Sequence, residues 1–460
     1  EALRDLRCLK QFFELYIHPT VDRFRSKIAR KVRFADLWYL FPYGEEVFLA
    51  SALGAEARSS FTQTAESGAY QSVFRVYDLS GGRLQLSNPN DSEDESNNNF
   101  QSSSAMVRID PFHIMCYHID WDSKSHSPVY HKIQIKPFEG ERDITSLDVY
   151  PTKYHKDFEP IRQQLLTRGR KFLKLTKPTH MRYYGRTYDS HPCGDNSSHS
   201  LSATSFVESE VMVDFEQSPR GWQPNFGLDE FLIYEIDNVD DWPVTFWQDK
   251  EHNLNPIFLA EFVFMEPEDT NWLRERARDQ NSFLRDWNLY QAGHRTEPIQ
   301  TLESDDDLVL LPSRVMGYSY RDRTFNAFNI DRLEPVTAKS EGFDGLALPK
   351  GHQMMVEALV KEHFIKKEAY EKHGRSAPGM DMISGKGRGL IMLLHGYPGV
   401  GKTSTAECVA QSTGRPLFSI TCGDLGLDPV QVETSLNDKF RLAAKWNCVL
   451  LLDEADVFLA

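Results

Sequence analysis

Short apolar runs and helical stripes alternate along the C-terminal third of the chain. The apolar runs Leu390–Leu394, Pro416–Thr421 and Cys448–Leu452 have the length and composition of β-strands. Helical periodicity follows the first run at Ser404–Ala410 and returns at Pro429. The second helix carries an apolar stripe that we expect in the core, formed by Val432, Leu436, Phe440 and Ala443. Because the last run is continuously apolar, it is typical of a parallel strand buried on both faces. The alternation predicts an α/β fold.

The remainder of the chain has a different pattern. Residues 1–33 are predicted to be helical, with Leu9, Phe12, Phe13 and Tyr16 on one face. Residues 34–234 show period-two alternation with one helical stretch, which predicts a β-rich α+β domain. Residues 81–104 are rich in Asn, Ser and acids, so we expect a disordered insertion. Residues 235–340 then form a connecting segment with a helical stretch and a small sheet, and 341–460 form the α/β unit.

Inside the β-rich domain, the pattern predicts a hairpin. Phe112–Cys116 and Val129–Ile135 alternate in register, and the polar stretch Asp120–Pro128 is expected to be a long loop between them. His113, His118 and Asp120 could suggest a metal site. Their spacing matches no metal-site geometry, so surface histidines are the preferred interpretation. A helix is predicted over Lys156–Leu173. We find no catalytic constellation in this domain and interpret it as an interaction or assembly module.

Composition narrows the function classes. The chain has 460 residues and a formal net charge of −15, which argues against non-specific binding to nucleic acid. Its six cysteines are scattered without a CxxC pair, as in proteins of a reducing compartment. The sequence contains no run of transmembrane length and no signal peptide. We therefore expect an intracellular protein of cytoplasm or nucleus, with organelle targeting left open.

The glycine-rich turn after the first apolar run is predicted to bind phosphate. Glycines let backbone N–H groups converge on phosphate oxygens, and the helix that follows adds positive potential at its N-terminus. A lysine and a hydroxyl residue close the turn, so Lys402 can contact the β- and γ-phosphates and Thr403 can join a Mg²⁺ shell. The residues expected to bind nucleotide are Gly396, Tyr397, Pro398, Gly399, Val400, Gly401, Lys402, Thr403 and Ser404.

Two carboxylates follow the last apolar run. Asp453 is predicted to hold Mg²⁺ together with Thr403, and Glu454 to activate the attacking water. Glu454 and Lys402 are thus the expected catalytic residues, with ATP and Mg²⁺ as ligands. Solvated acids on a loop are the alternative for this motif when it stands alone. Its combination with Lys402 favours a nucleotide site.

These motifs resemble a known family. His395–Glu407 and Leu450–Asp456 resemble the Walker A and Walker B motifs of AAA+ ATPases, a family with an α/β P-loop NTPase fold. Phe34–Gly44 and Phe343–Pro349 resemble segments of the large fungal AAA ATPases that carry a β-rich N-terminal domain of unknown function. The resemblance implies ATP hydrolysis, a homo-oligomeric ring, usually a hexamer, and remodelling of a protein partner. It also places Phe343–Gly345 near the adenine.

Two departures from that family affect the expectation. The loop Cys422–Leu427, where unfoldases usually carry an aromatic pore residue, has none. A polar sensor, an arginine finger and a helical lid would lie beyond Ala460, and the first residue is Glu1. We therefore expect a truncated fragment with an incomplete AAA+ core, which would hydrolyse no ATP by itself.

Two further functions remain alternatives. One is a nucleotide-gated scaffold that binds ATP without efficient turnover. The presence of Glu454 favours hydrolysis, because a scaffold needs no water-activating acid. The other is a different P-loop class, a GTPase or a small-molecule kinase. The sequence offers no guanine-specifying Asn-Lys-x-Asp after the P-loop, and it indicates neither a nucleic-acid partner nor a membrane segment.

Overall fold

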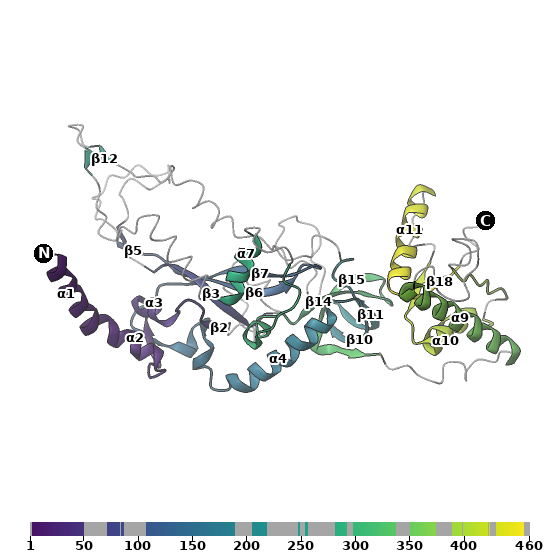
Figure 1. The fold of residues 1–460 in the computed structure, drawn as a ribbon, viewed down its shortest axis with the longest axis horizontal. Coiled ribbons are helices and arrows are strands. Elements are labelled where there is room, and N and C mark those ends of the chain that lie inside the picture. Colours follow the sequence, from purple (N-terminus) through teal and green to yellow (C-terminus); the bar gives the residue numbers. More distant parts are fainter. Residues whose placement is uncertain are drawn as a thin grey trace, which may run out of the picture.

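The structure is a computed structural model that describes residues 2–49, 71–82, 84–86, 107–188, 205–218, 247–248, 254–255, 281–291, 298–336, 350–373, 389–397, 399–421, 423 and 429–454. The described parts are arranged along one long axis (Figure 1). N-terminal helices lie at one end, two five-stranded sheets lie in the middle, and a unit of helices with one strand pair lies at the other end. We call residues 350–454 the C-terminal unit.

The N-terminal helical segment extends away from the sheets (Figure 1). It consists of α1 (Ala2–Phe12), a π-helical turn (Phe13–Ile17) and α2 (His18–Arg25). The apolar face expected from the sequence is solvent-exposed at Leu9, Phe12, Phe13 and Tyr16. Phe24 of α2, by contrast, is buried in the main core. These four apolar side chains are therefore not part of the hydrophobic core that the structure describes.

The helix expected over residues 1–33 is shorter than predicted. It ends at Arg25, and Ala29 enters the core. The chain then forms β1 (Lys31–Arg33), which pairs antiparallel with β8 (Glu141–Asp143). Backbone hydrogen bonds to β8 thus take the place of the last expected helical turns. Local helix propensity does not predict this pairing, because β8 is distant in the sequence.

The first sheet is antiparallel, with strand order β7-β6-β3-β2-β9. Its buried face carries large aromatic side chains from several strands, including Phe48, Phe74 and Phe112. The short helix α3 (Leu37–Leu40) covers one end of this core. The strands are β2 (Glu46–Leu49), β3 (Val73–Gly81), β6 (Phe112–Trp121), β7 (His126–Ile135) and β9 (Val149–Pro151).

The predicted hairpin is confirmed, but its loop is shorter than expected. β6 and β7 pair along their whole length, with Ile114 opposite Ile133 and Trp121 opposite His126. The stretch Asp120–Pro128 was expected to be a long loop, yet both ends of it are strand. Its polar residues remain in the sheet because they find buried partners, such as Arg314 for Asp120.

The insertion expected at residues 81–104 lies mostly outside the described residues. Its first part is ordered, since Gly81 ends β3 and β4 (Leu84–Leu86) pairs antiparallel with β5 (Val107–Ile109). The expectation of disorder is therefore wrong for these first residues.

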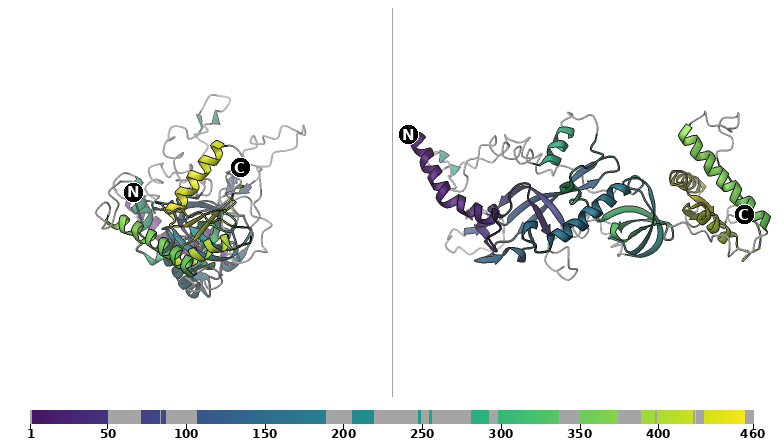
Figure 2. Two further views of the ribbon diagram at one scale, coloured as in Figure 1. Left: turned by 90° about the vertical axis from the view of Figure 1, so that its right-hand side faces the viewer. Right: turned by 60° about the horizontal axis from the view of Figure 1, so that its bottom comes forward.

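The second sheet is also antiparallel, with order β15-β14-β11-β10-β16. Helix α4 (Phe158–Leu175), predicted within two residues of its bounds, lies alongside the sheets (Figure 2). Its Lys171 donates from Nζ to the carbonyls of Ile330 at 2.6 Å and Leu333 at 2.7 Å. The strands are β10 (Thr179–Arg186), β11 (Phe206–Val213), β14 (Arg314–Ser319), β15 (Thr324–Asn329) and β16 (Leu333–Pro335).

This second sheet corrects the domain boundary expected at residue 234. β11, from the expected β-rich domain, pairs directly with β14, from the expected connecting segment. Because hydrogen-bonded strands of one sheet belong to one folding unit, the sheet unites both segments. A single hydrophobic core runs from Phe24 to Leu333 through both sheets.

Smaller elements lie between β11 and β14. Helix α7 (Ser282–Gln291) packs against the first sheet, where Phe283 stacks on Tyr117 with 6.2 Å between ring centroids. Ser304 caps α8 (Asp305–Leu308) by accepting a hydrogen bond from the Asp306 N–H. Two-residue strands β12 (Trp247–Gln248) and β13 (Leu254–Asn255) pair with each other.

Buried polar contacts connect the two sheets. Asp120 of β6 and Arg314 of β14 form an ion pair of 2.6 Å with both side chains buried. Arg75 of β3 pairs with Asp307 of α8 at 2.7 Å. These charges would be costly to bury alone, so the first pair fixes the two sheets to each other and the second fixes the first sheet to α8.

The expectation of surface histidines is wrong for His118, whereas His113 is partly exposed. His118 is fully buried, and its Nδ1 lies 2.8 Å from Nε2 of His131. Burial raises the pKa of Asp120, and the nearby Arg314 lowers it in part. Among the described residues, no cluster of three or more His, Cys, Asp or Glu side chains could hold a metal ion.

The C-terminal unit contains a parallel strand pair between helices (Figure 2). β17 and β18 pair in register, with Ile420 opposite Leu452, and helices α9 and α10 contact each other. The predicted alternation of helix and strand is present in β17, α11 and β18. The elements are α9 (Lys350–His373), α10 (Lys402–Thr413), β17 (Leu417–Ile420), α11 (Pro429–Lys445) and β18 (Val449–Leu452).

Three expectations for this unit are wrong. Leu390–Leu394 forms no strand, and Ile391 is 95% exposed, because the described residues place no strand beside this segment to complete its hydrogen bonds. β18 is only half-buried, since its described neighbour is β17 alone. Phe440 of α11, expected in the core, is 52% exposed. A strand pair leaves more apolar surface open than a full parallel sheet.

The buried histidines predict acid sensitivity of the N-terminal sheets. Burial lowers the pKa of His126 to about 4, and burial with the neighbouring His131 and Arg314 lowers the pKa of His118 well below its usual value. The unfolded chain binds these protons near pH 6.5, so stability is full above that pH. It should fall as the pH drops from 6.5 towards 4, by roughly 1 kcal/mol per pH unit for each histidine.

Urea unfolding at pH 7 to 4.5 tests this acid sensitivity. Because His126→Gln removes one of the buried histidines, it should flatten the decline by roughly 1 kcal/mol per pH unit. Equal slopes for wild type and His126→Gln would contradict the assignment.

Candidate nucleotide-binding site

The glycine-rich loop adopts a conformation that most residues avoid. Gly399 and Gly401 have left-handed φ values of 83° and 88°. Gly401 caps α10, and its carbonyl accepts hydrogen bonds from the Thr405 N–H at 2.9 Å and the Thr405 hydroxyl at 2.8 Å. A Cβ atom on Gly399 would meet nothing within 4 Å, so the space in front of the loop is open. The loop thus presents solvent-accessible backbone beside a helix N-terminus, as phosphate binding requires.

Lys402 is the first residue of α10 and lies across the loop. Its Nζ donates to the Gly396 carbonyl at 2.9 Å and to the Tyr397 carbonyl at 3.0 Å. These carbonyls hold the ammonium group over the loop. A bound phosphate could replace these two carbonyls as the partner of the ammonium group, because both hydrogen bonds are exposed to solvent.

Thr403 and Asp453 lie side by side although they are 50 positions apart in the chain. The Thr403 hydroxyl donates to Oδ2 of Asp453 at 3.2 Å. Asp453 directly follows β18, and its N–H donates to the Ile420 carbonyl at 3.0 Å, which extends the strand pairing. A hydroxyl and a carboxylate side by side are ligands that Mg²⁺ prefers. The residues therefore fit a magnesium ion at this position.

Glu454 stands next to this pair. Its N–H donates to Oδ1 of Asp453 at 3.1 Å, and its backbone has a left-handed φ of 54°. That conformation costs a non-glycine residue on the order of 1 kcal/mol and turns the chain sharply after the strand. Such strain is frequent at functional sites. The side chain is exposed, so its carboxylate is accessible to water.

The other expected site residues have mixed outcomes. Tyr397, Val400 and Ser404 are exposed around the loop. Pro398, the segment Phe343–Gly345 and most of the loop Cys422–Leu427 lie outside the described residues.

Sequence reasoning missed a contact near the site. Arg323, at the turn between β14 and β15, donates from Nη1 to the hydroxyl of Thr421 at 2.9 Å. Thr421 follows β17 as Asp453 follows β18. No sequence signal indicates this contact, because the two residues are 98 positions apart and belong to different patterns.

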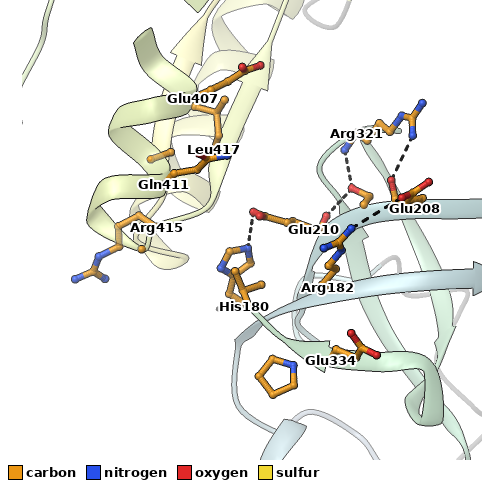
Figure 3. A pocket seen from close by; sticks show the side chains of 15 residues that line it. His180, Arg182, Glu208, Glu210, Arg321, Glu334, Glu407, Gln411, Arg415 and Leu417 are labelled. Carbon is orange, nitrogen blue, oxygen red and sulfur yellow. Dashed lines mark hydrogen bonds and ion pairs between the residues drawn. The ribbon is translucent and has the colours of Figure 1, made fainter. Parts of the chain in front are cut away.

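A cleft of about 580 Å³ lies between the second sheet and α10 (Figure 3), and its lining includes no residue of the glycine-rich loop. His180, Arg182 and Glu210 line it from the sheet, and Glu407, Gln411 and Arg415 line it from α10 and the residues after it. Charges of both signs face this cleft. This lining of charged side chains differs from the glycine-rich loop, which presents backbone groups.

Comparisons with known proteins agree with the site geometry. Residues 392–460 match the family model described as "ATPase family associated with various cellular activities (AAA)". Residues 23–156 match a domain of unknown function, DUF7025. No solved structure matches the chain significantly.

Curated relatives include Lon proteases. The chain is 26% identical to that of Leptospira interrogans serogroup Icterohaemorrhagiae serovar copenhageni (strain Fiocruz L1-130) over 180 residues, which is 35% of this chain and 20% of the relative. It is 33% identical to that of Mycolicibacterium smegmatis over 92 residues, which is 17% of this chain and 11% of the relative. The chain thus spans a fifth or less of these relatives. With the P-loop geometry, the matches show that this chain carries an AAA ATPase domain at its C-terminus and a DUF7025 domain near its N-terminus.

Proposed function

We propose that the protein binds ATP with Mg²⁺ and hydrolyses it at the site formed by Lys402, Thr403, Asp453 and Glu454. The observation that carries the proposal is the 3.2 Å contact between Thr403 and Asp453, with Lys402 over the same loop and Glu454 adjacent. It unites the glycine-rich loop and the acidic strand end in one place.

Each residue has a distinct role in this proposal. The loop N–H groups and Lys402 bind the phosphates, and Thr403 with Asp453 hold Mg²⁺, which when bound neutralises charge developing on the phosphate oxygens. Glu454 orients the attacking water and accepts its proton. In such reactions the protein forms no covalent bond to the phosphate, and positioning with electrostatic stabilisation supplies most of the rate acceleration.

The wider role is also a proposal. We infer that ATP turnover drives remodelling of a protein partner recruited by the N-terminal sheets, within a homo-oligomeric ring. The AAA domain supports this inference, since that family usually forms rings. Cys8, Cys116, Cys408 and Cys448 carry free thiols, which supports a reducing, intracellular compartment. Within the part of the chain that the structure describes, no helix has the length and apolarity needed to span a membrane.

A nucleotide-gated scaffold is the alternative function. It would use the same loop, Lys402 and Thr403 to bind ATP, and the ring would serve as structure. The exposed carboxylate of Glu454 beside the metal position favours turnover, because binding alone does not need it.

Lys402→Ala tests ATP binding. The change removes the ammonium group that lies over the loop, so ATP affinity of the full protein should fall by at least about 100-fold. Isothermal titration measures it. Lys361→Ala on the exposed face of α9 is the matched control and should bind as wild type. Wild-type affinity in Lys402→Ala would refute the site.

Glu454→Gln separates hydrolysis from binding. The amide keeps the shape of the side chain but cannot accept the proton, so turnover should fall by roughly 100- to 10,000-fold with ATP affinity nearly unchanged. Phosphate release and nucleotide titration on the same preparations provide the two readouts, and Glu433→Gln on α11 is the control. A wild-type rate in Glu454→Gln would show that another group activates the water. Absence of turnover in the wild type with intact binding would favour the scaffold.

A further inference from the structure

An aromatic cluster joins the second sheet to the C-terminal unit. The ring of Tyr318 lies 5.4 Å from those of Phe418 and Trp446, and Phe418 is fully buried. We call this cluster the seam. Its buried members are Met212, Tyr318 and Tyr320 from the sheet and Phe418, Ile420, Leu442, Ala443 and Trp446 from the C-terminal unit.

Polar contacts fix the seam at the end of α11. The Trp446 Nε1–H donates to Oδ2 of Asp214 at 2.7 Å, and Lys445 Nζ lies 3.1 Å from the same carboxylate and 2.8 Å from Glu216. Asp214 is buried, so losing these donors would leave a desolvated charge. The seam is therefore a fixed attachment, since sliding would break both the ring contacts and this buried anchor.

The seam has a polar contact next to the metal position. Arg323 donates to Thr421, the residue directly after β17, at 2.9 Å. The preceding residue, Ile420, lies in the seam, and its carbonyl accepts the Asp453 N–H at 3.0 Å. The turn between β14 and β15 thus contacts the C-terminal end of β17. The Ile420 carbonyl at this end accepts the hydrogen bond from Asp453.

On the opposite side of the unit, the residues that the structure describes form no comparable cluster with the sheet. There the charged cleft separates the sheet from α10, with Glu407 and Gln411 facing His180 and Glu210 across it (Figure 3). α10 begins at Lys402, so the phosphate-binding half of the site lies on the element beside the cleft. Thr403 lies on the same helix, whereas Asp453, the carboxylate ligand proposed for Mg²⁺, directly follows β18 on the strand pair held by the seam.

We propose that Arg323 is a positioning residue for the Mg²⁺-binding half of the site, through which the N-terminal sheets set the affinity for divalent cation. Its hydrogen bond fixes Thr421, and the end of β17 then holds Asp453 at the distance that Thr403 requires. Lys402 and the glycine-rich loop do not depend on this bond. The inference rests on the proposed function, and it assigns control of that site to a residue outside the AAA match.

Arg323→Asn tests the proposal in the full chain. Asn tolerates the left-handed φ of 58° at this position but is too short to reach Thr421. Mg²⁺ titration of a fluorescent ATP analogue should show a half-saturation concentration about fivefold higher than wild type. Affinity for the analogue in EDTA should be unchanged, which a general loss of folding would not allow. Arg321→Asn is the matched control in the same turn, because Arg321 bonds to Ser209 and Glu208 within its own sheet.

Two further variants test whether the contact itself is responsible. Thr421→Val should reproduce the shift, and the double variant should shift no further than either single one. Arg323→Lys, which can still donate to Thr421, should recover at least part of the affinity. An unchanged Mg²⁺ midpoint in Arg323→Asn would overturn the inference, as would additive effects in the double variant or an equal loss of affinity in EDTA.

The proposed function is judged separately. Asp453→Asn must raise the Mg²⁺ midpoint, and Lys402→Ala must weaken binding of the analogue by at least about 100-fold. If both do so while Arg323→Asn has no effect, the positioning role fails and the nucleotide site stands. If neither does so, the site itself is wrong.

Discussion

The parallel pairing of β17 with β18 is the constraint on which the nucleotide site depends. In-register pairing ends both strands at the same edge, with Ile420 opposite Leu452. One further backbone bond, from Asp453 to the Ile420 carbonyl, extends this order beyond the strands and brings the carboxylate to Thr403. A one-residue slip would move Asp453 by a strand rise of about 3.3 Å and break the contact with α10.

The N-terminal region is held together differently, by charges buried between its two sheets and between the first sheet and α8. Asp120 with Arg314 and Arg75 with Asp307 each link segments that are far apart in the chain. Such pairs add little net stability when compared with apolar packing, but breaking one leaves a buried charge without compensation. They therefore specify how the sheets fit together. The same burial depresses the pKa of the neighbouring His118.

These two constraints meet at the seam. Tyr318 belongs to the sheet that also carries Arg314, and Phe418 belongs to the strand pair that holds Asp453. Rigid sheets and a rigid strand pair can transmit a displacement that a flexible linker would absorb. Among the described residues, the cleft beside α10 separates that helix, which carries Lys402, from the sheet.

The sequence by itself determined the elements that depend on local pattern. The glycine-rich turn, helix α10 and strands β17 and β18 follow from nearby glycines, apolar runs and periodicity. The Thr403 hydroxyl lies 3.2 Å from Asp453, while the roles of these residues at a nucleotide site stay a prediction. Only the tertiary structure decided the shared second sheet, the burial of His118 and Asp120, and the absence of a strand at Leu390–Leu394. Each of these depends on a hydrogen-bonded or charged partner distant in the chain, and local propensity carries no information about which partner a strand or a polar side chain will find.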